Sequence, residues 1–145
     1  THAARLHDIG CMAIPDAILN KPGPLDAEEA AFVRKHPAAG ERILEAAPAL
    51  RHLAPLVRAI QEHHDGSGYP DGLSGDRIPI EARVIAVCNA FDTMLEKRPF
   101  RAAVDERTAI AELRARAGSQ FDPVVVEAFV RSLAVAHTGT GQIAA

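Results

Sequence analysis

The sequence predicts an all-α protein built as one bundle of helices. Hydrophobic residues make up 48% of the 145 residues and aromatic residues only 4%, so the core must consist mainly of Ala, Leu, Ile and Val. These side chains suit helices that pack closely together. Apolar residues also recur every three or four positions in several segments, which is the period of an amphipathic helix. The length fits one domain with one core, which we expect over residues 1–135.

Helix breakers and caps define the first helices. Residues 3–12 have the pattern of a helix that gives out at Gly10, and because this helix starts so early we expect the chain to begin inside a longer protein. Asp26 and Glu29 have capping-box spacing and predict a helix that runs until Pro37 interrupts it. Further helices are expected over residues 38–46 and from residue 49 onward.

The second half begins with a long loop. Residues 64–79 are rich in glycine and contain two prolines, and long loops inside compact domains are usually functional or disordered. Residues 80–94 then show the most regular amphipathic pattern of the chain. Asp105 and Asp122 stand at N-cap positions and predict two closing helices. Small residues dominate 136–145, where we expect a flexible tail.

Charge and composition exclude several classes of partner. A net charge of −3 and a pI of about 6.1 give no electrostatic footprint for a nucleic-acid backbone. No apolar run approaches the roughly 20 residues that cross a bilayer, so we expect no membrane segment. Cys11 and Cys88 are too few for a disulfide framework, and a reducing compartment follows. We therefore expect a cytoplasmic protein that binds neither nucleic acid nor membrane.

His7 beside Asp8 is the sharpest candidate for metal binding. Alone, such a pair on a helix is more often a surface or capping pair, so the surrounding sequence decides. The pair opens a longer pattern that resembles the HD-GYP family and covers nearly the whole chain. The matching segments are His7-Asp8-Ile9-Gly10-Cys11, residues 13–22, His36-Pro37, Asp65-Gly66-Ser67-Gly68-Tyr69-Pro70-Asp71-Gly72-Leu73, residues 85–92, residues 98–101 and Gln120-Phe121-Asp122-Pro123.

The resemblance implies an all-α HD-domain bundle with a glycine-rich GYP loop and two or three iron- or manganese-type ions that hydrolyse the bacterial messenger cyclic di-GMP. Imidazole and carboxylate suit such metals, and a bridged pair of ions can activate water and clamp a phosphodiester. If the family's roles apply here, His7 and His36 are each a ligand of one ion, and the carboxylate of Asp8 bridges two ions. Arg98 and Arg101 match positions that hold substrate phosphates. Alternatively, these two arginines bind nothing and only cover a solvent-exposed helix end.

Four positions depart from the family pattern, and three of them are ligand positions. The family has two adjacent histidines before a Glu, and counting back from Asp65 places Ile60 and Gln61 there. Asn89 replaces an aspartate ligand, and an amide carries no charge to offset a cation. Cys11 replaces a lysine and is either a packing residue or a soft ligand four residues after His7. The first ligand of the family lies upstream of residue 1.

His63 and His64 form a second histidine pair that lies three residues out of register. On a continuing helix they would stand about one turn, roughly 5.4 Å, beyond the expected ligand positions. That distance is too long for coordination unless the end of the helix is rebuilt. We therefore interpret the pair as unrelated to the family's ligands.

Three functions are consistent with this pattern. The first is a degenerate regulatory or protein-interaction domain of bacterial cyclic di-GMP signalling, with no metal or one weakly bound ion at His7, Asp8, His36 and Asn89. Its contacts would be a fused upstream signalling domain or a partner of the loop Gly68-Tyr69-Pro70, which in related proteins binds signalling domains.

In the other two functions the domain still binds the cyclic dinucleotide or a related phosphoester. One is an active metal-dependent phosphodiesterase that cleaves cyclic di-GMP or another phosphoester with an altered metal content. The other is a sensor that binds a cyclic dinucleotide through Arg98 and Arg101 without cleaving it. For the loop, the alternative is that Tyr69 only packs it onto the bundle.

Overall fold

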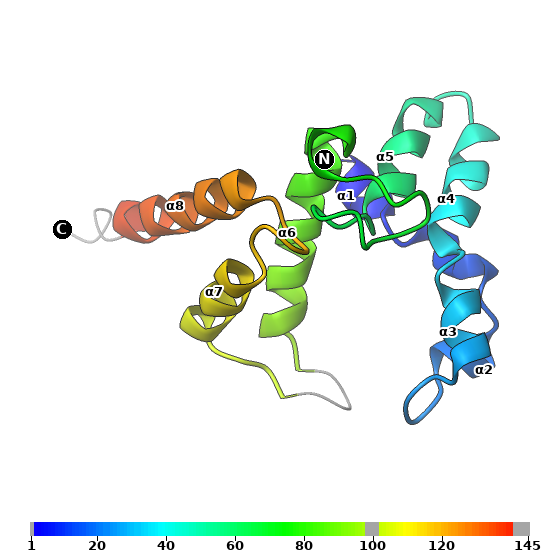
Figure 1. Cartoon of the computed structure of the whole chain (residues 1–145), viewed down its shortest axis with the longest axis horizontal. Coiled ribbons are helices and arrows are strands. Elements are labelled where there is room, and N and C mark those ends of the chain that lie inside the picture. The colour runs from blue at the N-terminus through cyan, green and yellow to red at the C-terminus, as the bar shows by residue number, and fades with distance from the viewer. Residues whose placement is uncertain (1, 98–101, 141–145) are drawn as a thin grey trace.

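The computed structural model describes residues 2–97 and 102–140, and these residues fold into helices joined by loops, with no β-strand among them. Helices α4 and α5 lie on one side of the long helix α6, and α7 and α8 lie on the other (Figure 1). The predicted all-α fold is confirmed. Within the described ranges no helix is long and apolar enough to cross a bilayer.

The first half contains short helices. The segment predicted as one helix over 3–12 is divided after Leu6, and Gly10, in its second part, packs against His36 and Gly40 of the next long helix. The capping box is confirmed, since Asp26 Oδ1 accepts from the amide of Glu29 at 2.9 Å and Glu29 Oε2 accepts from the amide of Asp26 at 2.8 Å. The elements are α1 (His2–Leu6), the 3-10 helix η1 (Ile9–Ala13), α2 (Asp16–Leu19), α3 (Ala27–Val33), α4 (His36–Glu45), the 3-10 helix η2 (Arg51–Leu53) and α5 (Ala54–Ala59).

The second half follows the sequence pattern closely. The N-caps are confirmed: Asp105 accepts from the amide of Thr108 at 2.7 Å, and Asp122 accepts from the amide of Val124 at 2.8 Å. Helix α8 runs to Thr140, beyond the predicted start of the tail, and the rest of that tail lies outside the described residues. The elements are the 3-10 helix η3 (Gly75–Arg77), α6 (Ile80–Leu95), α7 (Glu106–Ala115) and α8 (Pro123–Thr140).

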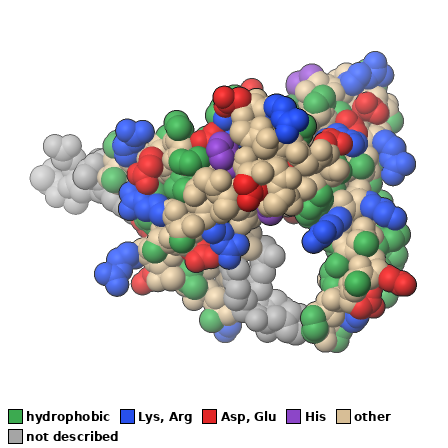
Figure 2. Space-filling model, viewed as in Figure 1, with side chains coloured by type: hydrophobic (Ala, Val, Ile, Leu, Met, Phe, Trp, Pro, Cys, Tyr) green, Lys and Arg blue, Asp and Glu red, His purple; other side chains and the backbone are tan. Residues whose placement is uncertain are grey.

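Apolar packing is divided between two clusters, where the sequence had predicted one core. The first joins α1, α4 and α5 to the start of α6 and includes Leu44, Val57 and Ile60. The second joins the later turns of α6 to α7 and α8. Helix α6 is long enough to enter both clusters, which explains the division. On the face in Figure 2, cationic and anionic side chains are intermixed.

Candidate metal centre

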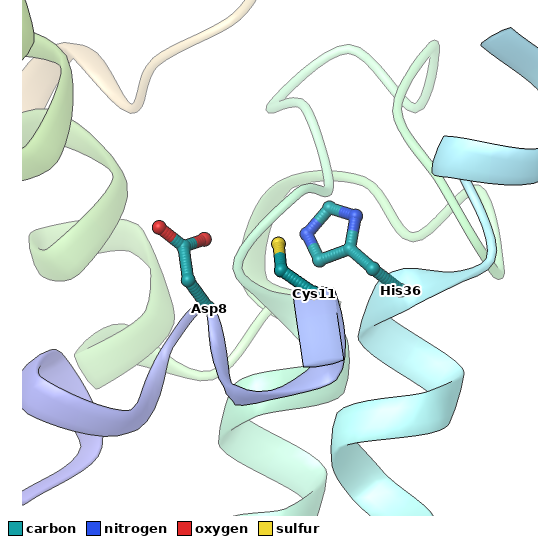
Figure 3. Close-up of side chains that lie close together, drawn as sticks. All are labelled: Asp8, Cys11 and His36. Carbon is teal, nitrogen blue, oxygen red and sulfur yellow. The ribbon is translucent and has the colours of Figure 1, made fainter. Parts of the chain in front are cut away.

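Asp8, Cys11 and His36 form the candidate metal centre. One possible ligand atom from each residue, a carboxylate oxygen, a thiol sulfur and a ring nitrogen, lies within 4.8 Å of the other two. Figure 3 shows Asp8 and Cys11 on the same stretch of chain, with His36 facing them from the start of α4. No other group of three or more such residues is found in the part of the chain that the structure describes.

A close backbone contact holds these two segments together. A Cβ atom at Gly10 would lie 1.8 Å from the carbonyl oxygen of His36 and 2.7 Å from the amide nitrogen of Gly40, so only glycine allows η1 to approach α4 this closely. Asp8 directly precedes the 3-10 helix that contains Cys11. Residues three apart eclipse in a 3-10 helix, which accounts for the two side chains sharing one side of η1.

The orientation of the His36 ring leaves one nitrogen facing the cluster. His36 is buried, with 6% of its surface exposed. Its Nδ1 lies 2.8 Å from the carbonyl oxygen of Val33, and because a carbonyl only accepts, Nδ1 must carry the proton. The nitrogen that faces Cys11 and Asp8 in Figure 3 is therefore Nε2, the atom through which a neutral imidazole could bind a metal here.

His7 lies beside the cluster but is not part of it. Its Nδ1 is 2.7 Å from the carbonyl oxygen of Ala4, and its Nε2 is 2.9 Å from Asp8 Oδ2. The contact with Asp8 raises the pKa of His7 above its ordinary value. Burial, together with the nearby Asp8 charge, raises the pKa of Cys11. The predicted role of His7 as a ligand stays a prediction, whereas its neighbour Asp8 and His36 do converge.

The other predicted ligand positions are elsewhere. Ile60 is 4% exposed and packs in the first apolar cluster. Together with Gln61 and Asn89 it lines a half-open cleft of about 440 Å³ between the end of α5, helix α6 and helix α7. Asp8, Cys11 and His36 are not among the residues lining this cleft. The predicted phosphate-binding residues Arg98 and Arg101 lie outside the described residues.

The second histidine pair does not join the metal cluster. His63 Nδ1 is 3.0 Å from the hydroxyl of Ser67, and its side chain lines the cleft. The backbone of His64 is fixed, since its amide donates to Gln120 and its carbonyl accepts from Gly75. Relocation of the family's histidines to this pair would have required a rebuilt helix end that turned one of them toward His36. Among the described residues, neither reaches the group that contains His36.

The glycine-rich loop is anchored by a buried carboxylate. Glu62 is 4% exposed, and its two oxygens accept from the amides of Asp71 at 2.6 Å and Leu73 at 3.0 Å. Arg58 fixes the same loop, donating from Nε and Nη2 to the carboxylate of Asp71 at 2.6 and 2.7 Å and from Nη1 to Glu41 at 2.6 Å. The loop is therefore tied to α4 and α5 by charge-assisted bonds.

Tyr69 is half-buried. It packs edge-to-face on His36, with 6.4 Å between ring centroids, and the guanidinium of Arg34 lies 5.7 Å from its centroid. Burial raises the pKa of its hydroxyl. The alternative that Tyr69 packs the loop onto the bundle accounts for these contacts. A partner for Gly68-Tyr69-Pro70 stays a prediction.

Sequence reasoning missed two parts of this arrangement. It treated residues 7 and 11 as neighbours on an α-helix, whereas the 3-10 period pairs Asp8 with Cys11. It also gave Glu62 no role, although a carboxylate placed just before a glycine-rich loop is a natural acceptor for the free amides of that loop.

The comparisons with known proteins agree on one protein family. A family model described as "HD domain" matches residues 1–125. The chain is 42% identical over 142 residues to the cyclic di-GMP phosphodiesterase response regulator RpfG of Xanthomonas campestris, covering 97% of the chain and 38% of that protein. It is 42% identical to the 3'3'-cGAMP-specific phosphodiesterase 2 of Vibrio cholerae, covering 87% of the chain and 24% of that protein.

Further matches agree in sequence and fold. A cyclic di-GMP phosphodiesterase of Thermotoga maritima is 41% identical over 131 residues, covering 89% of the chain and 36% of that protein. A crystal structure of a cyclic GMP-AMP specific phosphodiesterase of V. cholerae superposes with a TM-score of 0.67 at 19% identity, over 88% of the chain and 36% of that structure. The chain thus spans about a quarter to two-fifths of the length of these relatives.

Proposed function

The chain belongs to the HD-GYP family of HD-domain proteins, and from that premise we propose that it is a regulatory domain of the cyclic dinucleotide phosphodiesterase type whose metal centre is too incomplete for hydrolysis. Its partner is a signalling domain, fused or separate, in the bacterial cytoplasm. The greater length of the relatives supports fusion to other domains.

One observation carries the proposal: an aliphatic and an amide side chain stand where the family pattern has adjacent imidazoles. Ile60 is buried among apolar residues and has no atom that binds a cation. Gln61 replaces an imidazole by an amide, which is a weak ligand, and Asn89 replaces a carboxylate and so offsets none of the charge of a second ion. Two-metal phosphodiester chemistry requires both ions, one at the attacking oxygen and one at the leaving oxygen.

The remaining donors fit one ion. Asp8, Cys11 and His36 supply three ligand atoms close enough to converge, and three protein ligands with an open fourth position are a common arrangement for a divalent ion. When bound, such an ion would supply a Lewis acid at η1. The chain's own residues would orient it, with Val33 fixing the His36 ring and Gly10 holding η1 against α4.

The anchored loop supports an interaction role. Glu62 and Arg58 hold the segment from Gly68 to Leu73 in one conformation, and a preformed surface loses little entropy when a partner binds. A regulatory domain that no longer hydrolyses its substrate can keep the surface of this loop for binding a partner. Tyr69 contributes through the shape of the loop as well as through its partly exposed ring.

A second candidate function is phosphodiester hydrolysis itself. The relatives are named for cleaving cyclic di-GMP or cGAMP, at about 40% identity over nearly the whole chain. Their names support hydrolysis more directly than they support its loss, which is argued only from the residues of this chain. The third function, a sensor that does not cleave, is supported by the cleft, whose volume is within the range of small-molecule sites.

A hydrolysis assay separates the first two functions. The full-length parent of the chain, in which the family's upstream ligand is available, is incubated with cyclic di-GMP and with 3'3'-cGAMP in the presence of Mn²⁺ or Fe²⁺, and we expect no linear product. A restoration variant carrying Cys11→Lys, Ile60→His, Gln61→His and Asn89→Asp should gain metal affinity over wild type. Turnover by the wild-type chain would overturn the proposal in favour of the phosphodiesterase.

Calorimetry tests the sensor. Cyclic di-GMP is titrated into wild type and into Arg98→Ala without added metal. A sensor that reads the phosphates through this arginine requires tighter binding by wild type. Equal heats in the two titrations would remove the sensor.

A further inference from the structure

We propose that Asp8, Cys11 and His36 form a site for one zinc-like divalent cation, with the Cys11 thiolate as a direct ligand. This inference rests on the proposed function in one respect, that the centre is not the two-ion cage of an active phosphodiesterase. It assigns a role to Cys11, which the family resemblance explains only as the loss of a lysine.

The geometry brings three different donor atoms to one point. Their mutual distances of up to 4.8 Å exceed by about 1 Å the roughly 3.3–3.8 Å between ligands of a tetrahedral ion with bonds of about 2.0–2.3 Å. Asp8 is exposed, so its side chain has room to adjust when an ion binds. His36 and Cys11 stand on segments that the Gly10 contact already holds together.

The imidazole is prepared as a ligand. Its Nδ1 lies against the Val33 carbonyl oxygen, so Nε2 is the nitrogen turned toward Cys11 and Asp8. Metal-binding histidines commonly make such a bond with the second nitrogen, which fixes the ring and its tautomer. His7 lies next to this group, with its Nε2 2.9 Å from Asp8 Oδ2.

The sulfur determines which metal the site prefers. A protonated lysine at position 11 has no lone pair for a cation, whereas a thiol adds a soft donor. On binding, the Cys11 thiol releases its proton to solvent, and the thiolate and the Asp8 carboxylate together balance the charge of a divalent ion. A donor set of sulfur, nitrogen and oxygen suits Zn²⁺ or Co²⁺, whereas Mg²⁺ and Mn²⁺ prefer oxygen ligands.

Cobalt absorption spectroscopy tests the thiolate directly. Co²⁺ is titrated into the reduced 145-residue chain. We expect a near-ultraviolet thiolate-to-cobalt charge-transfer band and visible bands of tetrahedral strength, reaching a plateau at one ion per chain. Zn²⁺ should bleach these bands, and a large excess of Mn²⁺ should leave them in place.

The chain supplies a matched control cysteine. Cys88 lies on α6, is partly buried like Cys11 and, like it, has a pKa raised first by burial. Cys11→Ser should abolish the charge-transfer band and weaken Co²⁺ binding by about a hundredfold, the upper end of what even second-shell changes cost. Cys88→Ser should leave both unchanged. Far-ultraviolet circular dichroism establishes that each variant keeps its helices.

The outcomes separate this inference from the proposed function. No charge-transfer band in folded wild type, or a band that persists in Cys11→Ser, overturns the thiolate site, whatever the hydrolysis assay shows. Hydrolysis by the wild-type chain overturns the proposed function, and the cobalt spectrum still reports whether Cys11 is a ligand.

Discussion

Removing the buried carboxylate of Glu62 should release the glycine-rich loop. Glu62 accepts two amide hydrogen bonds, at 2.6 and 3.0 Å, and is 4% exposed. Bonds to a charged group contribute about 1.5–3 kcal/mol each, so Glu62→Ala removes about 3–6 kcal/mol of interaction. Because the variant no longer buries a charge, we expect a net loss of about 2–4 kcal/mol.

The Glu62 prediction is measured by thermal unfolding and hydrogen exchange. At about 3 °C per kcal/mol for a domain of this size, Glu62→Ala should lower Tm by about 6–12 °C. The amides of Asp71 and Leu73 should exchange faster, while those of α8 change little. Glu62→Gln, which keeps one acceptor oxygen, should lose less, and the exposed control Glu45→Ala should hardly move Tm. An unchanged Tm and unchanged loop exchange in Glu62→Ala would refute the anchoring role.

Three further perturbations follow from the same contacts. Arg58→Ala removes three hydrogen bonds that clamp the loop and should cost about 1 kcal/mol in urea unfolding, and Arg58→Lys should restore little because it lacks the planar fork. Gly10→Ala places a methyl group 1.8 Å from the His36 carbonyl oxygen and should cost about 1–3 kcal/mol or more by overpacking, together with loss of the cobalt band. Burial opposes ionisation of Asp122, but its arginine and amide partners outweigh burial and lower its pKa, so the stability that it contributes above the unfolded pKa of about 4 is lost as pH falls below that value. Unfolding free energy measured from pH 7 to pH 3 should therefore fall less steeply in Asp122→Asn, and parallel curves would contradict this.

Local signals made most of the fold predictable from sequence. The caps at Asp26, Asp105 and Asp122 act within one turn of their own helices, so the residues that define each boundary are adjacent in sequence. The apolar period of residues 80–94 likewise reports the burial of α6 directly. The division of residues 3–12 was not predicted, and neither was the close contact of Gly10 with a helix that begins 26 residues later, since such a contact is remote in sequence.

The candidate site also has a part that could be predicted from the sequence and a part that could not. The prediction that Ile60 and Gln61 stand at the family's two histidine positions comes from counting along one segment. The meeting of Cys11 with His36 depends on η1 being a 3-10 helix and on how closely it packs against α4, which a linear pattern does not encode. The burial of Tyr69 depends on Arg34 and His36, which are remote in sequence from the loop.

Metal content tests the central claim most directly, because one incomplete cage and two complete cages differ in stoichiometry. The chain is expressed in medium supplied with iron, manganese and zinc, purified without chelator, and measured by elemental analysis against protein concentration. A centre limited to Asp8, Cys11 and His36 predicts no more than one ion per chain, with little iron or manganese. Two tightly held iron or manganese ions per chain would contradict it.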